Sequence, residues 1–152
     1  MTKVEQTLFT VGVFKDVTWA ERGIDALRQQ GFQASVMTIM VKDGPEAASF
    51  VQKVTGGDPE RLDVPKVGAL LGAGSLVGTL QGGARDLGRV GIAAAMRRAG
   101  FQPHDGLIYE TLTERGGVLV AIEDPARASD ALAVMLSFGG GNAAIGAWAG
   151  RV

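Results

Sequence analysis

The stretch that decides the fold is Thr7-Leu-Phe-Thr-Val-Gly-Val-Phe14, which a turn at Lys15-Asp16 follows. Alternate residues in it form a wholly apolar set, Phe9, Val11 and Val13. A period of two with one apolar face is typical of a β-strand that packs on a core. We therefore predict a strand here, and its apolar face requires partner elements from the rest of the chain.

A helix and a second strand are predicted directly after this strand. The spacing of Thr18 and Glu21 is that of a capping box, and Gly31 is a suitable C-terminal cap. The segment Phe32–Val41 alternates apolar and small residues and predicts a strand that is buried on much of both faces. Residues 1–42 thus predict a strand–helix–strand unit whose strands run parallel, because such crossovers are right-handed.

The middle of the chain changes composition twice. Residues 43–66 are a polar, mostly acidic connector with a possible short helix at Glu46–Val54. Between Gly68 and Gly100, nine of the 33 residues are glycine and seven are alanine, and glycine recurs every four residues at Gly74, Gly78 and Gly82. This spacing favours closely packed helices, so residues 67–100 are predicted to be a glycine- and alanine-rich helical insertion.

The last third predicts a helix and a second strand–helix–strand unit over residues 101–152. In the helix, Pro103–Glu114, we expect the apolar side to carry Leu107, Ile108 and Leu112, with Glu110 and Glu114 exposed. A strand, a helix and a strand are then expected at Val118–Ile122, Ala126–Phe138 and Asn142–Trp148. The two units predict one α+β domain over residues 1–152, with a ferredoxin-like, four-stranded sheet.

Composition excludes several classes of protein. The 152 residues include 23 glycines and 46% hydrophobic residues without a collagen-like period, which excludes both collagen and plain disorder. With no cysteine there are no disulfides, zinc–thiolate sites or iron–sulfur clusters. The net charge of −1 argues against nucleic acid as a partner. The sequence shows neither a secretory signal nor a long apolar span, so we expect a cytoplasmic protein.

The glycine pattern Gly72-x-Gly74-x-x-x-Gly78 is the nearest approach to a cofactor motif. A dinucleotide site needs a strand, a tight turn and a helix, with an acidic residue about 20 positions further on. That acidic residue is missing, and no Walker lysine follows Gly82-Gly83 or Gly139-Gly140-Gly141. We therefore expect no cofactor, and close helix packing explains the glycines better.

Four residues with acid–base chemistry are candidates for a ligand or interface site. Asp16 and Asp43 follow the two N-terminal strands and could line one edge of the sheet, where paired carboxylates could bind a hard cation or act as acid and base. His104 and Tyr109 lie on the Pro103–Glu114 helix, and a single histidine cannot build the usual histidine metal site. Helix capping and surface solvation are the alternatives, so we predict no metal site and no catalytic residue.

Arg85 and Arg89 complete the candidate set. They belong to a cluster with Arg97 and Arg98 in which Asp86 is the only acidic residue. Such a cluster after an uncharged segment suits an anionic membrane surface. The favoured alternative is that small residues let two helices pack while the arginines solvate the outside, so membrane association is the less expected outcome.

Nearly the whole chain resembles the bacterial general stress protein (YflT-like) family. The similarity rests on Thr10-Val-Gly-Val-Phe14, Trp19-Ala-Glu21 and Gly31-Phe32 near the start, and on Gly100-Phe-Gln-Pro103, Tyr109-Glu110 and Arg115-Gly-Gly-Val-Leu-Val120 near the end. The middle is shorter and more charged than in that family. The resemblance implies a small cytoplasmic, stress-associated protein and supplies no catalytic residue.

Two functions are expected from these observations. The first is a non-enzymatic, stress-associated protein that acts through homo-oligomerisation or a protein partner, because a sheet with two apolar faces needs a second cover. The alternative is a sensory or regulatory module that binds a small molecule between the sheet edge and the glycine-rich helices, where glycine lets a ligand approach the backbone. An enzyme is not expected.

Overall fold

Six strands form one antiparallel sheet in the order β3-β4-β2-β5-β1-β6. The computed structural model describes residues 7–140 and 143–148. The strands are β1 (Thr7–Phe14), β2 (Met37–Lys42), β3 (Glu60–Val64), β4 (Gly68–Ala73), β5 (Val118–Glu123) and β6 (Ala144–Trp148). The α+β class expected from the sequence is confirmed, whereas the expected count of four strands is wrong.

The two additional strands form a hairpin in segments that the sequence assigned to other structures. β3 lies in the predicted connector and β4 in the predicted helical insertion, and they pair with each other before β4 joins β2. Small residues conceal β4, because Gly68, Gly72 and Ala73 interrupt the alternation of side chains. Gly72 is used for packing: a Cβ atom there would lie 3.2 Å from Met40 Cγ and from Val77 Cγ2.

The first two strands run in the same direction, as the sequence predicted. They are not neighbours, because each pairs antiparallel with β5, which lies between them. The helix between them, α1 (Val17–Gln29), begins one residue before the predicted capping box. Its N-cap is Asp16, whose carboxylate accepts a hydrogen bond from the Trp19 amide at 3.0 Å, so the prediction of Thr18 as the cap is wrong.

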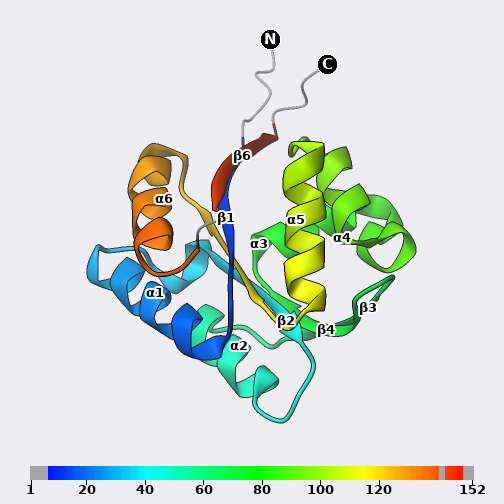
Figure 1. Ribbon diagram of the computed structural model, residues 1–152, viewed down its shortest axis with the longest axis horizontal. Helices are drawn as coiled ribbons and strands as arrows, with labels where there is room; N and C mark the ends of the chain where they lie inside the picture. The colour runs from blue at the N-terminus through cyan, green and yellow to red at the C-terminus, as the bar shows by residue number, and fades with distance from the viewer. Residues whose placement is uncertain (1–6, 141–142, 149–152) are drawn as a thin grey trace.

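Helices cover both faces of the sheet (Figure 1). On one face lie α1, α2 (Ala47–Thr55) and α6 (Ala128–Ser137), whose apolar side chains pack with Ile39, Val120 and Ile122. On the other lie α3 (Ser75–Gln81), α4 (Asp86–Ala99) and α5 (Pro103–Glu114), which pack on Phe9 and Val11. The second face of the sheet is therefore covered by the chain itself and requires no second subunit.

The orientation of α5 agrees with the sequence prediction only in part: Leu112 packs against the core and Glu114 is exposed, as expected, but the other three residues are not placed as predicted. Leu107 and Ile108 are 55% and 41% exposed, whereas Tyr109 and Glu110 are buried. Gly106 explains the difference, since a Cβ atom there would lie only 3.2 Å from the Ala93 carbonyl oxygen of α4, and this close approach turns the neighbouring Tyr109 face inward.

Glu110 on α5 stabilises the neighbouring helix α4. Within α4, Gly91 has a φ of 92° and breaks the helical geometry. The Glu110 carboxylate accepts a hydrogen bond at 3.2 Å from the amide of Ala93, just after the break. The carboxylate thus caps the restarted helix, which the apparent surface pair of Glu110 and Glu114 did not indicate.

Candidate functional site

Four of the six residues singled out in the sequence do not meet in one site. Asp16 caps α1, and Asp43 pairs with Arg61 at 3.1 Å. His104 is exposed and its Nε2 lies 3.3 Å from Asp105 Oδ1, while the Tyr109 hydroxyl donates to the Val11 carbonyl at 3.3 Å. No shared cleft brings these groups together among the pockets found in the described residues.

The other two residues, Arg85 and Arg89, line the same hollow of about 470 Å³. It lies between the edge strand β3 and the turn that joins α3 to α4. A third arginine, Arg61, reaches it from β3, and the remaining lining residues are Leu62, Asp63, Gln81, Ala84 and Gly88. We call this hollow the arginine groove.

Each arginine of the groove has a carboxylate partner. Arg61 pairs with Asp43 and, at 3.8 Å, with Asp63; Arg85 lies 3.7 Å from Glu60. Both guanidinium groups are largely exposed, and exposed pairs contribute little free energy. Since a guanidinium has five N–H donors, most remain available to an anion that enters the groove.

Arg85 adopts a backbone conformation that disfavours its side chain. Its φ is 54° and its ψ is 52°, in the left-handed region that costs a non-glycine residue about 1 kcal/mol or more. Glycine adopts the left-handed conformation without this penalty, and two glycines, Gly82 and Gly83, lie just before Arg85 in the same turn. Arg85 is therefore held in this turn at a cost to stability, in a backbone conformation that it shares with Lys66, whose φ is 73°.

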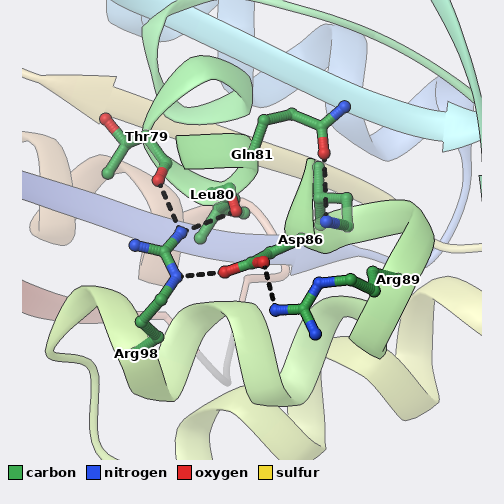
Figure 2. A network of polar contacts seen from close by, with 7 residues as sticks. Thr79, Leu80, Gln81, Asp86, Arg89 and Arg98 are labelled. Atoms are coloured by element: carbon green, nitrogen blue, oxygen red, sulfur yellow. Dashed lines mark hydrogen bonds and ion pairs between the residues drawn. The ribbon is translucent and has the colours of Figure 1, made fainter. Parts of the chain in front are cut away.

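Beneath the groove, a buried carboxylate fixes one of the arginines (Figure 2). Asp86 is only 3% exposed and accepts hydrogen bonds from Arg89, at 2.7 Å, and from Arg98. The hydrogen bond from Arg89 lowers the pKa of Asp86; burial opposes this effect, and Arg98 adds to it. Arg98 is 45% exposed, in line with the sequence interpretation that the arginines lie on the outside. What the sequence did not indicate is that its guanidinium also donates to the Thr79 and Leu80 carbonyls at the end of α3.

The glycine pattern of the sequence does form a strand, a turn and a helix. Gly74 lies between β4 and α3, but its backbone packs against β2, and the Leu76 amide donates to Thr38 Oγ1 at 3.0 Å. This amide is therefore used within the protein. Gly78 is on the exposed side of α3, where a Cβ atom would meet nothing within 4 Å, so the prediction that it marks close helix packing is wrong.

Sequence reasoning missed Arg61, although a signal for it exists. In Glu60-Arg-Leu-Asp-Val64, polar Arg61 and Asp63 alternate with apolar Leu62 and Val64, and the structure exposes the first pair and buries the second. This is the pattern of a half-buried edge strand. Its position in an acidic connector concealed it.

Comparison of the chain with family models, with curated proteins and with solved structures gave no match. Among the residues that the structure describes, no three His, Cys, Asp or Glu side chains are grouped so as to hold a metal ion. In the same part of the chain, no helix combines the length and the apolar character needed to cross a membrane. The resemblance to the general stress protein family stays a prediction.

Tyr109 gives a direct optical test of the packing of α5, since it is the only tyrosine. Burial, and secondly the charge of Asp105, raise its pKa above the usual 10.0. The neutral phenol therefore stabilises the fold fully below pH 10, and this contribution is lost as the pH rises toward the folded pKa. In an alkaline titration, tyrosinate absorbance should appear only together with loss of the circular dichroism signal, whereas in urea it should appear near pH 10. Ionisation near pH 10 in folded protein would contradict the burial.

Proposed function

We propose that this protein is a non-enzymatic binding module that holds a small anionic ligand in the arginine groove. The observation that carries the proposal is the convergence of Arg61, Arg85 and Arg89, from β3, the α3–α4 turn and α4, on one hollow. Its volume of about 470 Å³ is in the usual range for small-molecule sites. The left-handed Arg85 and the buried support of Arg89 by Asp86 favour a site over a solvated surface.

The ligand chemistry that this groove suits is a phosphate or a similar oxyanion. Guanidinium groups bind such anions through paired N–H donors, and a multiply charged oxyanion can compete with the carboxylates of Asp43 and Asp63 that now face Arg61 and with that of Glu60 that faces Arg85. A free phosphate and a phospholipid headgroup share this chemistry, so the peripheral membrane alternative is a second source of the same ligand. Candidate acid–base groups lie apart, which supports a role without catalysis.

Calorimetric titration with inorganic phosphate and pyrophosphate tests the proposal, with sedimentation on anionic vesicles as a second arm. We expect saturable binding in at least one of the two assays, and Arg89→Gln should weaken that binding about tenfold or more. Arg85→Gly should weaken binding while raising the free energy of unfolding by about 0.5–1 kcal/mol, because it relieves the left-handed arginine.

Arg97→Gln is the matched control, since it removes the same charge from α4 without lining the groove. It should leave both affinity and stability unchanged. Absence of saturable binding in both arms, or equal binding by Arg89→Gln and the unaltered protein, would count against an anion site.

Partner binding or homo-oligomerisation is a second candidate, and one observation favours it. Leu107 and Ile108 are exposed on α5 and border a hollow of about 260 Å³ with Thr111 and Leu112. Native mass spectrometry of the titrated samples separates the two candidates, because it reports ligand mass and subunit number together.

We also propose a ferredoxin-like core for this fold. We take strands β2, β5, β1 and β6, with helices α1 and α6, as a ferredoxin-like core, and the elements from α2 to α5 as its insertion. The order β2-β5-β1-β6 and the antiparallel pairing on both sides of β5 support this assignment. A stress-associated, cytoplasmic and bacterial context remains part of the proposal, and its stress-associated and bacterial parts rest on the family resemblance alone.

A further inference from the structure

A second hollow, larger than the arginine groove, lies on the opposite face of the sheet. It has a volume of about 530 Å³ and lies between the first turns of α1, the end of β2 and the helix α2. We call it the helix cleft. It shares no lining residue with the arginine groove, so a ligand in the helix cleft would occupy a different site from an anion in the groove.

The base of the helix cleft is apolar. Val41, Ala47 and Phe50 line it and are each less than 10% exposed, and Val17 at the start of α1 is partly open to solvent. A branched aliphatic or aromatic group that enters the cleft would leave water and contact these side chains. Burial of such a group is favourable, so the base of the cleft selects an apolar ligand.

Four charged side chains border this base, and two of them neutralise each other. Glu21 on α1 and Lys53 on α2 form an ion pair of 3.7 Å across the cleft. The other two, Lys42 and Glu46, have no ion pair or side-chain hydrogen bond within residues 7–140 and 143–148. The cleft therefore offers one uncommitted cation and one uncommitted anion beside an apolar surface.

The positions of these two groups result from the fold. Lys42 is the last residue of β2 and is half-buried, while Glu46 is the residue before α2 and does not cap that helix with its own carboxylate. The sequence pointed to this edge of the sheet through Asp16 and Asp43. The structure instead turns both aspartates to other partners and presents their neighbours, Val17 and Lys42, to the cleft.

We propose that the helix cleft binds a free α-amino acid with an apolar side chain. The ligand carboxylate would pair with the Lys42 ammonium, its ammonium with the Glu46 carboxylate, and its side chain would lie on Val41 and Phe50. An apolar carboxylic acid leaves Glu46 without a partner, and an apolar amine does the same to Lys42. A peptide separates its two charged ends, so only a single amino acid presents both beside one side chain.

Calorimetric titration with leucine and phenylalanine tests the proposal, and leucine analogues test each contact in the unaltered protein. Leucinamide lacks the carboxylate and N-acetylleucine lacks the ammonium, so each should bind about tenfold or more weakly than leucine. Glutamate, which has no apolar side chain, should not bind measurably in the cleft.

Two substitutions then assign the contacts to residues. Lys42→Met should weaken leucine about tenfold or more and leave leucinamide affinity unchanged, and Glu46→Gln should weaken leucine and leave N-acetylleucine affinity unchanged. Lys15→Met, which removes a lysine that does not line the cleft, should leave leucine binding as it is.

Each alternative result is decisive. No saturable binding of leucine or phenylalanine by the unaltered protein at millimolar concentration overturns the proposal. Equal binding of leucine and its two analogues also overturns it, since the charges would then not be recognised. If Lys42→Met weakened leucinamide as much as leucine, Lys42 would not be the carboxylate contact.

Discussion

Alanine at Gly74 is expected to lower the free energy of unfolding by roughly 3 kcal/mol or more, from a clash and backbone strain combined. The φ of Gly74 is 119°, a conformation that L-residues with a side chain rarely adopt. A Cβ atom would lie 2.5 Å from Thr38 Cα and 2.6 Å from the Met37 carbonyl oxygen, and it would also strike Thr38 Oγ1. These atoms belong to a strand with neighbours on both sides, which cannot withdraw. A displaced Thr38 would also lose its hydrogen bond from the Leu76 amide.

Gly78→Ala is the matched control, because it makes the same chemical change four residues away. Space is open around a Cβ atom at Gly78, and the residue lies inside α3. Alanine is the better helix former, so this variant should gain about 0.5–1 kcal/mol. Urea denaturation of both variants measures the difference. Similar midpoints for the two variants would refute the close approach of β2 to the turn before α3.

The glycine repeat shows what local spacing can and cannot predict. Gly74, Gly78 and Gly82 have the same spacing and three different tasks: close approach to β2, a solvent-exposed helix position, and a C-cap beneath the Arg98 guanidinium. The first and third tasks depend on residues far away in the sequence, Thr38 and Arg98. The spacing of the glycines indicates that they lie on one face of a helix, but it does not indicate which residues pack against that face.

The same reason explains which elements could be predicted. β1, α1 and β5 have strong apolar periodicity of their own, and the sequence places them within a few residues. β4 escapes prediction because glycine and alanine provide no alternation. In α5, Tyr109 and Glu110 are buried in place of Leu107 and Ile108, because Gly106 outweighs the apolar count. In each failure the packing of small residues against a distant segment decided the structure.

Part of the candidate site could be predicted from the distribution of charge along the sequence. The excess of arginine over acid around Arg85 and Arg89 is visible in the sequence, and the structure places both on one groove. Arg61 is absent from that local pattern because the sheet brings it from β3. The sequence pattern presents Asp86 as one more charge on a solvated helix, whereas Arg89 and Arg98 approach it from both sides and allow its burial.

Asp86→Asn is expected to lower the melting temperature strongly at neutral pH and to flatten the acid limb of the stability profile. The hydrogen bond from Arg89 keeps the pKa of Asp86 below its usual 3.8, with Arg98 adding to the effect against the opposing effect of burial. A lowered pKa means that the carboxylate stabilises the fold above pH 3.8 and that this contribution is lost as the pH falls through the folded pKa. The variant should therefore differ most from the unaltered protein at neutral pH, and the difference should shrink in strong acid.

Asp130→Asn isolates the effect of burial from that of charge. Asp130 also pairs with an arginine three residues away, Arg127 at 3.3 Å, but its side chain is 57% exposed. Exposed pairs of this kind contribute little, so the control should melt almost as the unaltered protein does. Thermal melts of the three proteins at a series of pH values give the comparison. If Asp86→Asn and Asp130→Asn shifted the melting temperature equally at neutral pH, or if the Asp86→Asn difference persisted in strong acid, the ionised Asp86 carboxylate between Arg89 and Arg98 would not be what stabilises this part of the fold.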